Sequence, residues 1–127
     1  MTPGVAALAA LLAVGAPPSS YRVAATTATR EALLAGDAKA WAPAARVRWG
    51  PAQYATEFAA VWDADALYLR FAATDPMPWH TMTHRDDHLW EEEVVEIFLD
   101  PARSGRDYFE LEISPANVVC DVRMERP

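Results

Sequence analysis

The sequence has a single cysteine and little positive charge, and each shortage limits what the protein can be. Cys120 cannot form an internal disulfide, so the cysteine content gives no information about redox compartment. The chain has 11 Lys and Arg against 18 Asp and Glu, which gives a formal net charge of −7. Because phosphate backbones repel such a surface, we expect no nucleic-acid partner. A neutral polyol or a cation suits this charge balance better.

Common enzyme motifs are also missing. The chain contains neither a Gly-x-Ser-x-Gly nucleophile motif nor a glycine-rich phosphate-binding loop. No internal repeat or low-complexity tract is present. With 127 residues, of which 52% are hydrophobic, the chain is predicted to form one globular domain.

The N-terminal segment contains an apolar run over residues 5–14 that is too short to span a bilayer as a helix. Its length, and the small residues at its end, are typical of a signal peptide, although no basic residue precedes the run and Pro17 follows it directly. We predict a leader over residues 1–20, a domain over residues 21–127, and a secreted or periplasmic protein. A short N-terminal helix is the alternative. No basic amphipathic helix is present, so we expect no membrane insertion.

Short segments with period-two alternation or β-branched residues predict an all-β fold. The predicted strands are residues 21–29, 47–49, 58–62, 67–71, 94–99, 109–113 and 118–124. An Asp-rich turn joins two of them as a hairpin, and residues 32–41 are predicted as a turn with Trp41 facing inward. We therefore predict an antiparallel β-sandwich of jelly-roll type. Its open edge would suit self-association or a partner chain that completes the sheet. Cys120 is expected to be a buried thiol.

The segment from Trp79 to Glu96 is the densest in polar residues and is predicted as a long surface loop that leads into a strand. A sugar presents an apolar C–H face and a rim of hydroxyls, which suit an indole ring and charged hydrogen-bonding groups respectively. Trp90 with Glu96 fits this chemistry, and Trp79 and Arg85 are looser candidates for the same site.

Metal and haem binding are competing interpretations of the same loop. His80, His84 and His88 are four residues apart and would share one face of a helix, but the preceding prolines and the β-branched threonines between them disfavour a helix. The metal ligands therefore stay unknown, and a structural Ca²⁺ held by loop oxygens is a further alternative. Met77 or Met82 with a histidine could ligate haem, although no Cys-x-x-Cys-His motif is present.

Two pairs of glutamates raise the question of glycoside hydrolysis, which needs two carboxyl groups about 5–10 Å apart. Glu92 and Glu96 would lie about 13 Å apart on one strand face, and Glu110 and Glu112 about 7 Å apart. The second pair alternates with apolar residues, which is the pattern of a solvent-facing strand side. We therefore expect no catalytic residues and no enzyme activity.

The run Trp-Glu-Glu-Glu-Val-Val-Glu-Ile-Phe-Leu-Asp-Pro, which starts at Trp90, resembles the family 9 carbohydrate-binding modules and their relatives. The stretches that carry this resemblance are residues 62–71, 75–76, 90–101 and 108–117. The resemblance implies a non-catalytic β-sandwich that holds a glucan or xylan end, or a small sugar, between two tryptophans, with structural calcium nearby. Trp90 matches one stacking residue and Glu96 a sugar-bonding residue. Nothing here matches the second tryptophan, or the arginine expected on the strand after the run.

Overall fold

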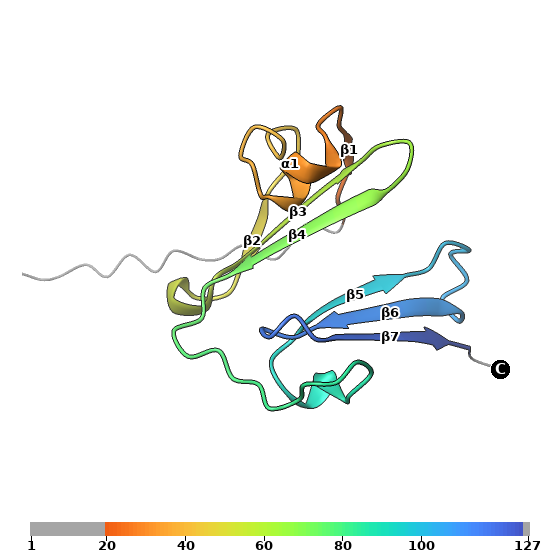
Figure 1. The fold of residues 1–127 in the computed structure, drawn as a ribbon. Coiled ribbons are helices and arrows are strands. Elements are labelled where there is room, and N and C mark those ends of the chain that lie inside the picture. The colour runs from red at the N-terminus through yellow and green to blue at the C-terminus, as the bar shows by residue number, and fades with distance from the viewer. Residues whose placement is uncertain (1–19, 126–127) are drawn as a thin grey trace, which may run out of the picture. The chain divides into compact units, whose positions relative to one another are not determined.

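The computed structural model describes residues 20–125, and these residues confirm the all-β prediction. They form seven strands in two sheets, with one short α-helix and two single-turn 3-10 helices. The chain divides into two compact units, one ending at Thr74 and the other beginning at Asp75 (Figure 1). The leader predicted over residues 1–20 lies outside the described residues, except for Ser20. No helix within residues 20–125 has the length and apolar character needed to cross a membrane.

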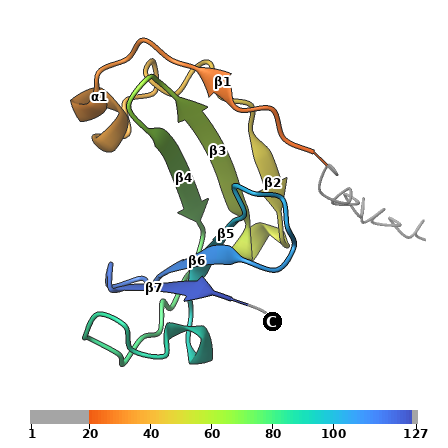
Figure 2. The same ribbon diagram turned by 90° about the vertical axis from the view of Figure 1, so that its right-hand side faces the viewer.

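The first unit is built around one central strand. Its elements are β1 (Ala24–Ala25), α1 (Arg30–Leu34), β2 (Val47–Trp49), the 3-10 turn η1 (Ala52–Tyr54), β3 (Thr56–Trp62) and β4 (Leu67–Ala73). Strand β3 pairs with β4 along one edge, and with β2 and β1 along the other (Figure 2). All these pairs are antiparallel except β1 with β3, which is parallel.

The predicted hairpin is confirmed as β3 and β4. The carboxylate of Asp63 accepts hydrogen bonds from the backbone N–H groups of Asp65 and Ala66, both at 2.8 Å. This side chain therefore closes the turn, as Asx turns do. The alternation along β4 predicts that Leu67 faces the core and Tyr68 the solvent. In the structure Tyr68 packs against the buried cluster, whereas Leu67 is 48% exposed.

Two sequence predictions in this unit are wrong. Only Ala24–Ala25 of the strand predicted over residues 21–29 pairs with β3, because the chain then bends toward a helix. Residues 30–34, partly within the predicted turn, form α1 because the Thr29 hydroxyl accepts a hydrogen bond from the Ala32 N–H and caps the helix. Gly36, with a φ of 72°, follows the last turn of α1.

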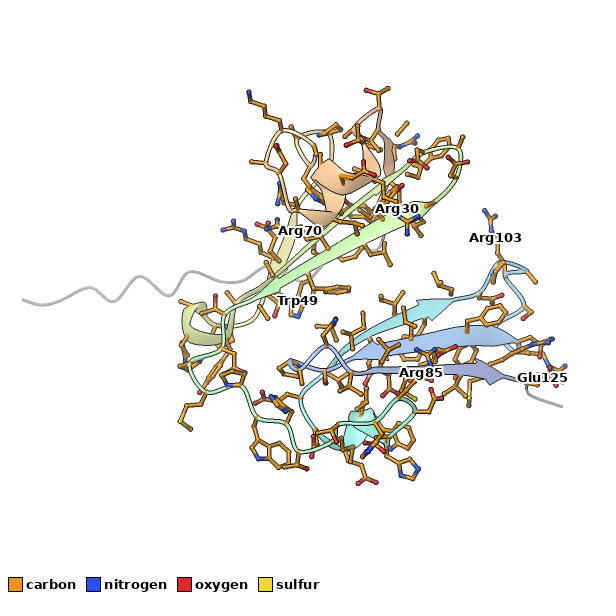
Figure 3. The ribbon with its side chains drawn as sticks, in the orientation of Figure 1. Arg30, Trp49, Arg70, Arg85, Arg103 and Glu125 are labelled. Atoms are coloured by element: carbon orange, nitrogen blue, oxygen red, sulfur yellow. The ribbon has the colours of Figure 1, made fainter. Side chains whose placement is uncertain are left out.

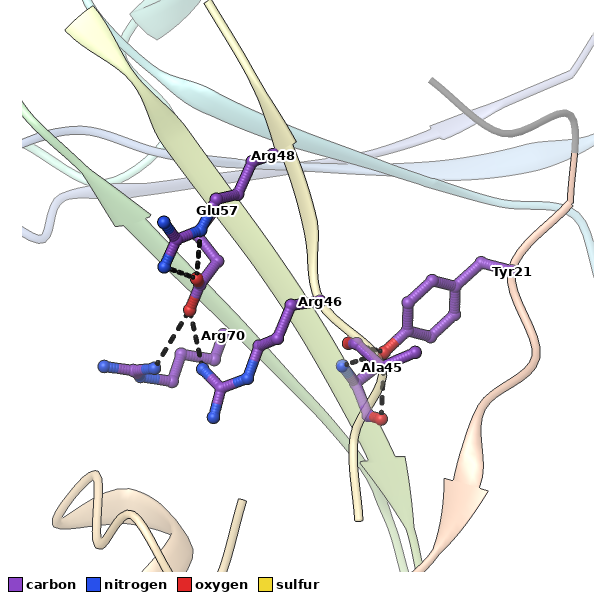
Figure 4. Close-up of polar contacts among 7 residues, drawn as sticks. Tyr21, Ala45, Arg46, Arg48, Glu57 and Arg70 are labelled. Carbon is purple, nitrogen blue, oxygen red and sulfur yellow. Dashed lines mark hydrogen bonds and ion pairs between the residues drawn. The ribbon is translucent and has the colours of Figure 1, made fainter. Parts of the chain in front are cut away.

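The core of the first unit lies between α1 and strand β3. Trp41 is 3% exposed, as predicted, and its indole N–H donates to the Leu33 carbonyl at 2.9 Å. Both residues pack against Ala59 and Val61 of β3. Tyr21 secures the start of the unit, because its hydroxyl accepts from the Ala60 N–H at 2.9 Å and donates to the Ala45 carbonyl at 2.6 Å (Figure 4).

The second unit is a three-stranded antiparallel sheet in the order β5-β6-β7. Its elements are the 3-10 turn η2 (Leu89–Glu91), β5 (Val95–Leu99), β6 (Tyr108–Ile113) and β7 (Val119–Met124). These strands confirm the three predicted strands to within a residue at each end. The register places Glu96, Glu112 and Cys120 side by side across the sheet. Cys120 is 3% exposed, which confirms the buried thiol.

Candidate functional site

Trp90 is presented by the single turn η2, which packs against β6. Leu89 anchors this turn, being only 1% exposed, and the next side chain, Trp90, is 50% exposed. The imidazole of His88 stacks on the Trp90 indole, with ring centroids 4.5 Å apart and an angle of 21° between the planes. No second aromatic ring among residues 20–125 stacks on this indole. Trp90 is therefore a supported aromatic platform that keeps half of its surface in solvent.

A row of three glutamates lies on one face of this sheet, and η2 packs against β6, which carries two of them. Glu96 of β5 and Glu112 of β6 are direct cross-strand partners, so their Cβ atoms lie about 4.5–5.5 Å apart on one face. Glu110 lies on the same face, two residues from Glu112. Glu96 is exposed, whereas Glu112 is 1% exposed. The row therefore offers one open carboxylate to solvent and keeps another beneath the surface.

Glu112 is the residue for which the sequence prediction is wrong. The alternation along β6 predicts a solvent-facing side chain, but Glu112 is buried, and its Oε2 has no hydrogen-bond partner among the described residues. Burial raises the pKa of Glu112 above its usual value, and the charges of Glu110 and Glu96 raise it further. A hydrogen bond from the backbone N–H of Trp90 acts on this pKa in the opposite direction. Glu112 therefore ties the backbone of the platform residue to the sheet.

Glu92 and Glu93 of the acidic run bind the chain itself. The Glu92 carboxylate accepts from the hydroxyl and the backbone N–H of Thr81, the latter at 2.8 Å, and from the Met82 N–H at 3.2 Å. These bonds, those from Thr81 above all, lower the pKa of Glu92. Glu93 accepts from the Trp79 N–H at 2.7 Å. Both carboxylates therefore hold the preceding loop instead of facing a ligand.

The two looser candidates lie in this loop. Trp79 is 54% exposed, and its backbone is fixed by Glu93. Arg85 is labelled in Figure 3. Its guanidinium is paired with Asp121 of β7, and its Nε lies 3.9 Å from Asp86. Asp121 is opposite Leu111 in the register, so it belongs to the other face of the sheet from Glu96. Glu96 therefore shares one face of the sheet with Glu112, which the Trp90 backbone contacts, whereas Arg85 pairs with a residue of the other face.

The histidine loop is irregular, as predicted, and contains no helix before η2. The Asp87 carboxylate accepts from the N–H groups of Thr83 and His84, at 3.1 and 2.9 Å, and shapes the turn before η2. An open cavity of about 510 Å³ is lined by the side chains of this turn, including Met82, His84 and His88. Within residues 20–125, no three His, Cys, Asp or Glu side chains are grouped as metal ligands.

The described residues thus form a β-sheet module with a half-exposed tryptophan in the turn that precedes β5. The family described as carbohydrate family 9 binding domain-like matches residues 35–122. The chain belongs to this family, whose modules are generally non-catalytic. Neither the curated proteins nor the solved structures include a significant match to the chain.

Proposed function

We propose that this domain binds a saccharide without chemical turnover, by stacking the sugar on Trp90 and hydrogen bonding it to Glu96. The observation that supports the proposal is the half-exposed indole of Trp90, a residue whose backbone N–H contacts Glu112, the cross-strand partner of Glu96. The proposed ligand is a glucan or xylan chain end or a small sugar. The proposal includes a domain over residues 21–127 that follows a leader over residues 1–20 and works outside the cytoplasm.

The platform suits a sugar because its position is fixed before the ligand arrives. Leu89 is buried and Glu112 accepts from the Trp90 N–H, so little backbone freedom remains to be lost on binding. His88 supports one face of the indole. The other face is left for the C–H groups of a pyranose, and a large flat ring buries much apolar area at low entropic cost.

Glu96 supplies the polar half of the proposed site. Its carboxylate is exposed, and hydroxyl groups of a sugar donate strongly to an ionised acceptor. Glu112 is a positioning residue in this scheme, because it holds the Trp90 backbone and is itself buried. Trp79 and Arg85 belong to the loop before η2, and the proposal gives them a role only with a longer ligand.

Titration of intrinsic tryptophan fluorescence with cello- and xylo-oligosaccharides tests the proposal. We expect saturable binding to the wild type and a loss of about tenfold or more in affinity for Trp90→Ala, equivalent to about 1.4 kcal/mol or more. Glu96→Gln should weaken binding less, because the amide still accepts a hydrogen bond. Trp62→Ala is the matched control, since Trp62 is 48% exposed but belongs to strand β3 of the first unit.

Both tryptophan variants should keep the wild-type circular dichroism and melting temperature, because both side chains are half exposed. Equal affinities for wild type and Trp90→Ala would contradict the assignment of the site. A folded wild type that binds none of these sugars would overturn the proposed function itself.

A further inference from the structure

A second polar cluster lies on the first unit, where three arginines surround one glutamate (Figure 4). Arg46 Nη1 lies 2.6 Å from Glu57 Oε1, and Arg48 contacts Oε2 through Nε at 2.7 Å and Nη2 at 2.6 Å. Arg70 Nη1 lies 3.8 Å from Oε1, too far for a hydrogen bond. We name this set, Arg46, Arg48, Arg70 and Glu57, the arginine cluster.

Strand register brings these side chains together. Arg48 of β2 is the direct partner of Glu57 in β3, and Glu57 pairs with Ala72 of β4 on its other side. Arg70 is two residues from Ala72, so it points to the same face. Arg46 immediately precedes β2 and reaches the same carboxylate. The cluster is therefore fixed by three neighbouring strands of one sheet.

Charge is unbalanced within the cluster. Three guanidinium groups against one carboxylate leave a formal excess of +2, in a chain whose net charge is −7. The hydrogen bonds from Arg48 and Arg46 lower the pKa of Glu57, so its carboxylate remains ionised at neutral pH. No other carboxylate among residues 20–125 lies within 4.0 Å of these three arginines.

Hydrogen-bond donors are in excess as well. A guanidinium carries five N–H donors, whereas a carboxylate offers about four acceptor positions in all. The side chains remain accessible: Arg48 is 76% exposed, and Arg46 and Arg70 are each 35% exposed. One arginine would be enough to balance Glu57 as an ordinary cross-strand pair. The remaining N–H donors and the excess positive charge are therefore available to bind an anion.

Space for a ligand lies beside Arg70. This residue lines a cavity of about 390 Å³ together with apolar side chains that include Leu33, Leu34 and Tyr68. A volume of this order is within the range of small-molecule pockets. An anionic group on the arginine cluster could therefore be joined to a less polar body that rests against the helix α1.

We infer that Arg46, Arg48 and Arg70 bind an oxyanion, supplied either by the carboxylate of an acidic sugar or by free sulfate or phosphate. Arginine suits this role because its planar fork donates two parallel hydrogen bonds to a carboxylate or phosphate-like group. Glu57 orients the guanidinium groups and limits their mutual repulsion before the anion arrives. The inference is independent of Trp90, which belongs to the second unit.

Calorimetric titration with glucuronate, glucose and sodium sulfate tests the inference, with ionic strength held constant so that screening does not mimic binding. Wild type should bind glucuronate or sulfate saturably and should not bind glucose at this cluster. Arg70→Gln keeps both close contacts to Glu57 and should weaken the anion by about threefold or more. The double variant Arg46→Gln/Arg48→Gln should abolish binding.

Arg123→Gln is the control, because Arg123 is an exposed arginine of the second unit that, among residues 20–125, forms an ion pair with Glu125 alone. Binding of glucuronate would support an acidic sugar as the ligand of the arginine cluster. Binding of sulfate alone would support the anion site, with a free oxyanion as its ligand. The inference is overturned if neither anion binds the folded wild type. It is also overturned if Arg70→Gln binds the anion as tightly as the wild type and the Arg123→Gln control do. The Arg70→Gln arm remains decisive should the double variant fail to fold.

Discussion

Replacing Glu112 with glutamine is expected to stabilise the protein at neutral pH. The Glu112 side chain is 1% exposed, its Oε2 has no partner among residues 20–125, and two further glutamates share its face. Leaving a buried polar group unpaired costs about 1–3 kcal/mol, and more when the group is charged. Glutamine keeps the shape and an oxygen acceptor for the Trp90 N–H while removing the charge. We expect a gain of about 1–3 kcal/mol in the free energy of unfolding at pH 8.

The sign of the pH dependence follows from the direction of the pKa shift. The pKa of Glu112 is raised in the folded state, so between the ordinary glutamate value and that raised value the folded protein binds more protons than the unfolded chain. The contribution of Glu112 to stability therefore falls as pH rises through this window. Below it, both states are protonated, and Glu112→Gln should match the wild type.

Urea unfolding of both proteins from pH 4 to pH 8 measures this difference directly. Other carboxylates affect both proteins alike, so the difference between them isolates Glu112. Glu125→Gln is the control, because Glu125 forms an exposed pair with Arg123 and should change stability by no more than about 0.5 kcal/mol. A difference that is independent of pH, or a variant less stable than wild type at pH 8, would refute the reasoning.

Two further predictions concern the core and the loop. Trp41→Ala should cost about 3–5 kcal/mol in urea unfolding, because it empties a buried site and removes the indole bond to Leu33, whereas Trp49→Ala, at a residue 38% exposed, should cost less. A smaller loss for Trp41 than for Trp49 would contradict the core assignment. Because the pKa of Glu92 is lowered in the folded state, the order it gives the loop should be complete above the ordinary glutamate pKa and be lost as pH falls through the lowered value. Glu92→Gln should therefore speed amide hydrogen exchange at Thr81 and Met82 at neutral pH, and unchanged exchange would show that other contacts hold the loop.

Strand positions are largely predictable from this sequence because alternation and turn residues are local signals. The Asp-rich turn predicts the hairpin of β3 and β4, and the inward position of Trp41 is also predicted. The helix α1 escapes prediction because five residues are too few for a 3.6-residue period to show, so only the cap at Thr29 marks it. The parallel pairing of β1 also escapes prediction, because it depends on where the chain returns in space.

The site is predictable in part, for a similar reason. Trp90 and Glu96 are separated by only six residues, so the sequence itself offers them as one candidate sugar site, and the family resemblance supports the same pair. Burial of Glu112 is not predictable, because period two treats Glu110 and Glu112 alike and only the turn η2 packed against β6 distinguishes them. The one signal that could have distinguished Glu112 from Glu110 is its cross-strand position opposite Glu96. The arginine cluster has only a partial local signal, the nearby Arg46 and Arg48, because Glu57 and Arg70 come from two other strands.

Residues of the acidic run have two different structural roles, and this difference has an evolutionary consequence. Glu92 and Glu93 hold the loop by bonding its backbone, so selection on folding alone preserves them. Trp90 and Glu96 expose their side chains, so they can change at little structural cost when a ligand changes. Under the proposed function, a descendant could therefore acquire a different sugar, or lose sugar binding, while keeping enough of the run to be recognised as a family member. Divergence among relatives should be sought first at the positions of Trp90 and Glu96, and last at those of Glu92 and Glu93.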